Sequence, residues 1–215
     1  VGIMSGSEIE FEIISDGAGR QKVEYSQGRI SYNGALYDEL VFEAQTEATM
    51  FAEPSFILYG VTIGVDFHWE RKVTQKFAGT LKFIVDGGKV TAVNIVGVED
   101  YLLSVISSEM KASAGLEFLK AHAVISRSWV MAQVEHRQSH VSRTPEPSCP
   151  VSEPVEGAGE YIKWFDHDDH TLFDVCADDH CQRYQGLTMA VGDTVRKAVD
   201  QTWGLVLTSE GKICD

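Results

Sequence analysis

Four side chains that commonly bind transition metals are crowded into one short segment, residues 170–181. The segment reads H-T-L-F-D-V-C-A-D-D-H-C and holds two histidines, two cysteines and three aspartates. Thiolate and neutral imidazole groups suit a borderline-soft divalent cation, and four of them without a free position make a structural zinc site rather than a hydrolytic one. The segment therefore predicts a tetrahedral zinc site formed by His170, Cys176, His180 and Cys181.

Other interpretations of this segment remain open from the residues alone. Cys176 and Cys181 could form a disulfide in an exported protein, or the segment could be an acidic surface loop with solvated histidines. Ligands at the neighbouring positions 180 and 181 would also need a turn, because successive residues of a strand point to opposite faces. A metallohydrolase would need an open zinc position, which four protein ligands do not leave.

Glu109 is the second candidate for chemistry. Cleavage of a glycosidic bond needs a proton donor, and a glutamic acid in a partly apolar setting can hold its proton near neutral pH. Glu109 follows the apolar Ile106 at the end of an expected helix and precedes a turn that contains Gly115. Its carboxyl could therefore project into a cleft, although a solvated glutamate at a helix end is the simpler interpretation of the pattern alone.

The elements that must position these residues begin with strands. Residues 1–97 are expected to be mostly antiparallel sheet, because Ile9, Phe11 and Ile13 alternate with glutamates at the period of a half-buried strand. Further strands are expected over residues 25–37, with turns at 27–28 and 33–34, over 56–65, and over 81–85 paired with 90–96.

Helical periodicity takes over at Val98. A short helix is expected to end near Glu109, and residues 116–137 predict a long helix that is apolar most of the way round and sits in the middle of a domain. Polar side chains on such a helix must be paired or line a cleft. They are Lys120, His122, Arg127 and Ser128.

The last third of the chain opens with a loop. Residues 138–160 hold four of the five prolines and predict an insertion or a lid. A helix is expected over residues 194–203, capped by Asp193 and stopped by Gly204, followed by a strand over 205–208. The pattern as a whole predicts an α+β fold, with a β-rich part over residues 1–92 packed on a mixed core over 93–215 that has a central buried helix.

Composition limits the function classes. With 215 residues and 44% hydrophobic content, the chain can bury a sizeable core as one large domain or two small ones. The net charge of -14, without a Lys or Arg cluster, argues against nucleic acid as a partner. No apolar run is long enough to span a membrane, and a chain starting at Val1 would not show an export signal. The pairing of Cys149 and Cys214 stays open.

Three blocks in the second half carry a resemblance to a known family. The first is V-E-D-Y-L-L-S-V-I-S-S-E-M followed by L-E-F-L-K-A-H-A-V-I-S-R-S-W, the second is D-H-C-Q-R-Y-Q-G, and the third is A-V-D-Q-T-W-G-L-V-L-T-S-E-G-K. In this order, over residues 94–213, they resemble the family of stage II sporulation protein D and the amidase enhancer of bacterial autolysins. Relatives continue past the third block, where this chain ends at Asp215.

The resemblance implies an exported peptidoglycan lytic transglycosylase, in the periplasm or at the cell wall. It would cleave the MurNAc-GlcNAc bond of glycan strands without adding water and leave 1,6-anhydro-MurNAc ends. Glu109 matches the catalytic glutamate and would serve as both acid and base, so no second catalytic carboxylate is required. The alternative is a non-catalytic cell-wall-binding activator of an N-acetylmuramoyl-L-alanine amidase, as the enhancer branch implies.

The resemblance also implies roles for other residues. Some members bind zinc through positions that align with the His170 to Cys181 set, where the ion would be architectural. Gln182 and Tyr184 match positions near the substrate groove. Arg127 matches a family position with Lys120 nearby, and either could pair with Glu109 or contact the sugar, unless Arg127 forms a buried ion pair. His122 and Trp129 stand where the family more often has Gln and Tyr.

Overall fold

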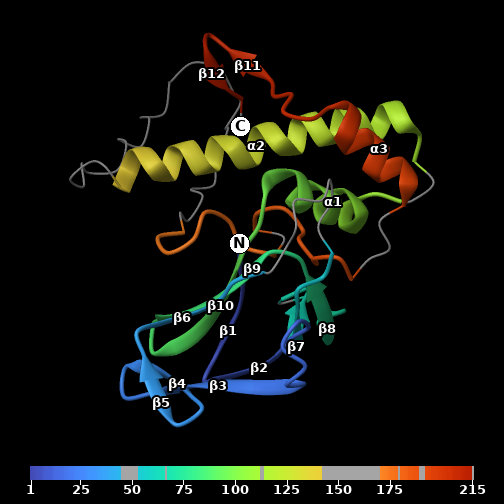
Figure 1. Cartoon of the computed structure of the whole chain (residues 1–215). Coiled ribbons are helices and arrows are strands. Elements are labelled where there is room, and N and C mark those ends of the chain that lie inside the picture. Colours follow the sequence, from blue (N-terminus) through green and yellow to red (C-terminus); the bar gives the residue numbers. More distant parts are fainter. Residues whose placement is uncertain are drawn as a thin grey trace.

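The computed structural model describes residues 1–44, 53–65, 67–111, 114–141, 170–178, 180–188 and 192–214. Two antiparallel sheets fill the lower part of Figure 1, and three helices lie above them. This arrangement confirms the α+β class and the β-rich N-terminal part. No helix in these ranges is both long enough and apolar enough to span a bilayer.

The first sheet has the strand order β1-β10-β9-β6. Its strands are β1 (Gly2–Gly6), β6 (Glu39–Phe42), β9 (Thr80–Asp86) and β10 (Lys89–Ile95). The expected hairpin joins β9 to β10, with Asp86 opposite Lys89 and with Gly87 and Gly88 both at positive φ in the turn. The expected boundary between residues 92 and 93 falls inside β10, which pairs with both β1 and β9. The division into two parts stays a prediction.

The second sheet has the order β5-β4-β3-β2-β7-β8. Its strands are β2 (Glu8–Ile13), β3 (Arg20–Ser26), β4 (Arg29–Tyr32), β5 (Ala35–Tyr37), β7 (Phe56–Ile63) and β8 (Arg71–Phe77). The two expected tight turns are present, since both residues of each, at 27–28 and 33–34, have the positive φ of a type I′ turn. The sheets pack through aromatic side chains, with the Phe11 ring 5.0 Å from both Phe42 and Phe83.

Helix α1 (Val98–Glu109) follows β10 directly and has the bounds that the sequence predicted. All six residues from Tyr101 to Ile106 are buried. Such enclosure is expected of a helix covered on more than one side, here by the strands below and by α2 and α3 above (Figure 1). The end of α1 is therefore held firmly, and Glu109 is its last residue.

Helix α2 (Leu116–Val141) is central in the helical layer, where it packs against both α1 and α3. Leu119, Ala123 and Val130 are buried, as are the three consecutive residues 126–128, whereas Phe118 and Ile125 are more than half exposed. The predicted central position of this helix is confirmed, and part of its surface is open to solvent. The helix also takes in residues 138–141 of the predicted insertion, and residues 142–160, with Cys149, lie outside the described residues.

The C-terminal segment differs in two details from its prediction. Helix α3 runs from Asp193 to Gln201 with Gly192 at its N-cap, so Asp193 lies in the first turn and is not the cap. A carboxylate there still interacts favourably with the helix dipole. The strand expected over residues 205–208 is instead a two-residue strand, β11 (Thr208–Ser209), paired with β12 (Lys212–Ile213). Gly204 follows the helix at positive φ, as expected of a helix stop.

Candidate functional site

Glu109 lies where three segments of the chain meet. Its Oε2 is 3.0 Å from Nε2 of His122 on α2, and its Oε1 accepts a 3.1 Å hydrogen bond from the backbone N–H of Arg183. The side chain is 28% exposed and that of His122 is 13% exposed. The carboxyl group is thus fixed by two contacts and still reachable from solvent.

Polar atoms near Glu109 have unused hydrogen-bonding capacity. Among the residues that the structure describes, the buried Oγ atoms of Ser107 and Ser108 and the buried Nδ1 of His122 have no partner. Buried polar atoms are nearly always satisfied in folded proteins, so a group of unsatisfied ones indicates a place for water or ligand. Here they belong to the two residues before Glu109 and to the ring that contacts it.

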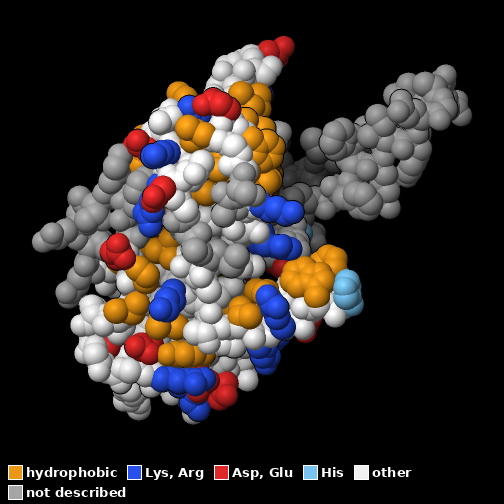
Figure 2. Space-filling view, turned by 90° about the vertical axis from the view of Figure 1, so that its right-hand side faces the viewer, with side chains coloured by type: hydrophobic (Ala, Val, Ile, Leu, Met, Phe, Trp, Pro, Cys, Tyr) orange, Lys and Arg blue, Asp and Glu red, His pale blue; other side chains and the backbone are white. Residues whose placement is uncertain are grey.

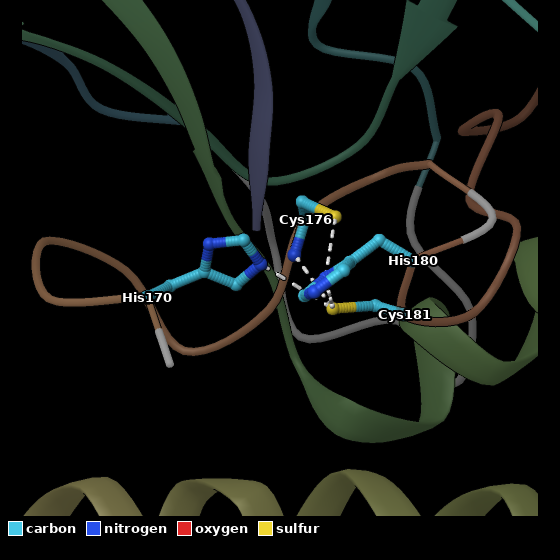
Figure 3. A group of neighbouring side chains, drawn as sticks. All are labelled: His170, Cys176, His180 and Cys181. Carbon is cyan, nitrogen blue, oxygen red and sulfur yellow. Dashed lines mark hydrogen bonds between the residues drawn. The ribbon is translucent and has the colours of Figure 1, made fainter. Parts of the chain in front are cut away.

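The predicted metal ligands come together in one cluster (Figure 3). One ligand atom from each of His170, Cys176, His180 and Cys181 lies within 4.8 Å of all the others. The Sγ of Cys181 is 3.4 Å from Nε2 of His170 and 3.6 Å from Nδ1 of His180, and the Sγ of Cys176 is 4.0 Å from the same Nδ1. The turn that adjacent ligands require is present, with the Cys181 N–H bonded to the Asp178 carbonyl.

The four residues could hold a metal ion, since two of these separations, 3.4 and 3.6 Å, lie in the range of a tetrahedral site and the third, 4.0 Å, is slightly longer. Bonds of about 2.0–2.3 Å to nitrogen and sulfur at tetrahedral angles place the ligand atoms about 3.3–3.8 Å apart. The thiols are free rather than joined in a disulfide. A hydrogen bond from the Cys181 thiol lowers the pKa of Cys176 to about 4, and the same contact raises the pKa of Cys181. A bound cation would favour the thiolate form of both cysteines, because metal ligation requires deprotonated sulfur.

The segment after the cluster connects it to Glu109. Arg183, which donates its N–H to Glu109, is two residues from Cys181. Further along, the N–H of Gln185 bonds to Oγ of Ser104 on α1 at 3.0 Å, and Leu187 bonds to the carbonyl of Lys76 on β8 at 2.7 Å. A structural ion would therefore fix the start of a segment that supplies one of the two contacts of Glu109.

Two residues expected to bind substrate are buried in the structure. Arg127 makes two hydrogen bonds to the carboxylate of Glu99, at 2.9 and 2.6 Å, which matches the alternative of a buried ion pair. Tyr184 stacks on Tyr101 and donates its hydroxyl to Oδ1 of Asn94 at 2.6 Å. Burial raises the pKa of Tyr184, so its hydroxyl stays a donor. Both side chains are thus held by protein groups, and a role for either at the substrate stays a prediction.

Gln182 and Lys120 are less enclosed. Gln182 accepts a 3.2 Å hydrogen bond from the Tyr101 hydroxyl, and burial keeps that hydroxyl protonated by raising its pKa. Lys120 pairs with Glu117 on the same helix at 2.8 Å rather than with Glu109. A role for either residue at the substrate stays a prediction.

His122 and the Arg183 backbone are the site groups that the sequence did not single out as partners of Glu109. His122 was visible in the sequence only as a polar residue on a largely apolar helix. His122 lies thirteen residues after Glu109, on the other side of the turn between α1 and α2. Their contact depends on how the two helices pack, which local sequence patterns do not predict. The Arg183 contact uses the backbone N–H, so the identity of the side chain could not have indicated it.

The fold and site thus define an α+β protein with a clamped, solvent-reachable glutamate and a closed thiolate-imidazole cluster. Comparison with protein families finds a match to SpoIID, the stage II sporulation protein, over residues 86–209. The match covers more than half of the 215 residues, so the chain belongs to this family, which is linked to the cell wall and its lysis. No curated protein and no solved structure matches the chain.

Proposed function

We propose that the protein is a peptidoglycan lytic transglycosylase that cleaves the MurNAc-GlcNAc bond, with Glu109 as the only acid and base. The observation that carries the proposal is the setting of Glu109. Among the described residues, an imidazole nitrogen and a backbone N–H hold its carboxyl group, which stays reachable from solvent as a proton donor to a substrate must be.

The contacts of Glu109 suit the two proton transfers of this reaction. Oε1 is occupied by the Arg183 N–H, which leaves Oε2, beside His122, as the oxygen that exchanges the proton. Glu109 donates this proton to the glycosidic oxygen as the bond to the anomeric carbon breaks. The resulting carboxylate removes the proton of the muramyl 6-hydroxyl, whose oxygen closes on the anomeric carbon. The acid is regenerated and no water is consumed.

The four-residue cluster has a supporting role in this proposal. Bound zinc would supply a fixed cross-link between His170, Cys176, His180 and Cys181 and no open coordination position. Because Arg183 follows Cys181 by two residues, fixing Cys181 would also restrict the position of the Arg183 N–H, which orients Glu109. A glycan substrate also places the protein outside the cytoplasm, in the periplasm or at the cell wall, where an amidase that removes stem peptides would be a natural partner.

Product analysis tests the function directly. Purified glycan strands, with and without stem peptides, are incubated with the protein, and mass spectrometry measures ends that are one water lighter than hydrolysis products. We expect anhydromuramyl ends from the wild type and a loss of about 10²–10⁴-fold in Glu109→Gln. The matched control is Glu117→Gln, which removes an exposed glutamate on α2. Binding without products from the wild type would contradict the enzyme and support the wall-binding activator.

A further inference from the structure

Two exposed aromatic side chains stand at the tip of the β7–β8 hairpin, outside the residues matched by the family. Phe67 is 51% exposed and Trp69 is 36% exposed. Their rings stack with centroids 5.6 Å apart and planes only 20° from parallel. Figure 2 shows the face of the molecule on which β7 and β8 lie, with a protruding hydrophobic patch flanked by Lys and Arg side chains.

The hairpin tip is held in shape despite its exposure. The Trp69 ring lies directly on Gly64, where an added Cβ would overlap it and where φ is positive. Backbone hydrogen bonds from Phe67 to the Gly64 carbonyl, at 3.0 Å, and from Glu70 to the Phe67 carbonyl, at 2.9 Å, close the turn. Large aromatic surfaces that are both exposed and preorganised are typical of binding sites.

The hairpin tip is connected to Glu109 through a single residue. The Arg183 guanidinium lies 5.3 Å from the centroid of the Trp69 ring, while the backbone N–H of the same residue bonds to Glu109. A cation over an indole face is a favourable contact. The aromatic pair therefore borders the same segment that orients the candidate catalytic acid.

A small cavity of about 100 Å³ lies beside this segment. Its lining includes Thr62, Gly64, Gln75, Arg183 and Gln185. Gln75 is buried on β8, and its Oε1 has no hydrogen-bond partner in the described part of the chain. A buried amide oxygen without a partner favours a ligand with an N–H donor.

We infer that the β7–β8 hairpin forms a saccharide subsite for the same glycan strand, away from the bond that is cleaved. The apolar C–H face of a pyranose ring would stack on the exposed surface of Phe67, which Trp69 holds in position, and the N–H of a 2-acetamido group would supply the donor that Gln75 lacks. The inference rests on the proposed function for the identity of the glycan. It gives the β-rich part, residues 1–92, a role in holding substrate.

Binding without turnover tests the subsite separately from catalysis. In a Glu109→Gln background, isothermal titration calorimetry measures the affinity for chitotetraose and for peptide-free glycan strands. We expect Trp69→Ala and Phe67→Ala each to weaken binding about tenfold or more, because Phe67 supplies the stacking surface and Trp69 holds it in position. Trp69→Phe should retain most of the affinity, and this variant also guards against loss of fold in Trp69→Ala. Trp203→Ala, at an exposed tryptophan after α3, is the matched control and should leave affinity unchanged.

The outcomes separate the two proposals. Unchanged affinity in both hairpin variants, or an equal loss in Trp203→Ala, would overturn the subsite even if the wild type makes anhydromuramyl products. Conversely, weakened binding in the hairpin variants together with an absence of products from the wild type would leave the subsite standing and remove the transglycosylase.

Discussion

The two ends of helix α1 each carry a glutamate that meets a basic residue of α2, yet the two pairs differ in character. At the first turn, Glu99 and Arg127 have side chains only 12% and 2% exposed and share two short hydrogen bonds. Arg127 also donates to the Leu205 carbonyl at 3.0 Å, and Glu99 accepts from the Gly204 N–H at 3.2 Å. At the last residue, Glu109 meets His122 through one contact and stays open to solvent.

This difference indicates that the Glu99–Arg127 pair stabilises the fold, whereas the Glu109–His122 pair is the candidate for function. The Glu99–Arg127 pair ties α1, α2 and the end of α3 together, and its charges are satisfied by protein groups, so it has little to offer a substrate. The helix dipole also favours a carboxylate at the first turn and not at the last. Glu109 keeps a reachable oxygen and contacts Nε2 of His122, whose Nδ1 has no partner in the described part of the chain. We therefore place the proposed chemistry at the Glu109–His122 pair.

Breaking the closed pair should have the largest effect, and that effect should be on stability. We expect Arg127→Met to lower the free energy of unfolding by about 3–5 kcal/mol, because Glu99 is left buried and unpaired. His122→Leu, at the open pair, should cost less than about 1 kcal/mol. Urea unfolding followed by circular dichroism measures both.

A double variant provides the control for this prediction. Replacing both charged partners, as Glu99→Leu with Arg127→Met, should restore part of the lost stability, because no unpaired charge remains. If Arg127→Met and His122→Leu lowered the free energy of unfolding equally, the two pairs would contribute equally to stability. The distinction between the two ends of α1 would then be wrong.

Removing a metal ligand should affect the Glu109 end of helix α1 and leave the Glu99–Arg127 end unchanged. Cys181→Ser is expected to reduce bound zinc from about one equivalent per chain to a small fraction, measured by atomic emission spectrometry. Activity should then fall about 10²-fold, because the Arg183 N–H is no longer held against Glu109. Cys214→Ser, which changes a free thiol away from the cluster, is the matched control. Full activity in a zinc-free protein would contradict the supporting role of the ion.

The sequence predicted local features well, but it predicted poorly the contacts between residues that are far apart along the chain. The α1 bounds, the two tight turns and the four-ligand set depend on spacing within a few residues, and all are present. Arg127 was equally visible in sequence, but its partner Glu99 is twenty-eight residues away and was not anticipated. The exposure of Phe118 and Ile125 on α2 and the pairing of β1 with β10 likewise arise from tertiary packing, which periodicity does not predict.

Variants of His122 sharpen the description of the open pair. We expect His122→Leu to lower kcat about tenfold with little change in KM, because Glu109 loses a hydrogen-bond partner that orients its Oε2. His122→Gln should recover most of that loss, since an amide can make the same contact and the family more often has Gln there. Release of anhydromuramyl ends under saturating and limiting substrate gives the two constants. Equal losses in both variants would show that the imidazole does more than position the carboxyl.

The smallest effect should come from Lys120, two positions from His122 on α2. Residues two apart on a helix do not face each other, and Lys120 already pairs with Glu117 one turn earlier. We therefore expect Lys120→Ala to change the free energy of unfolding by less than about 0.5 kcal/mol and kcat/KM by less than about twofold. The same product assay decides this, with Glu117→Ala as its partner variant. A tenfold rise in KM for Lys120→Ala alone would instead place this ammonium at the sugar, and the open site would then extend along α2 beyond the Glu109–His122 pair.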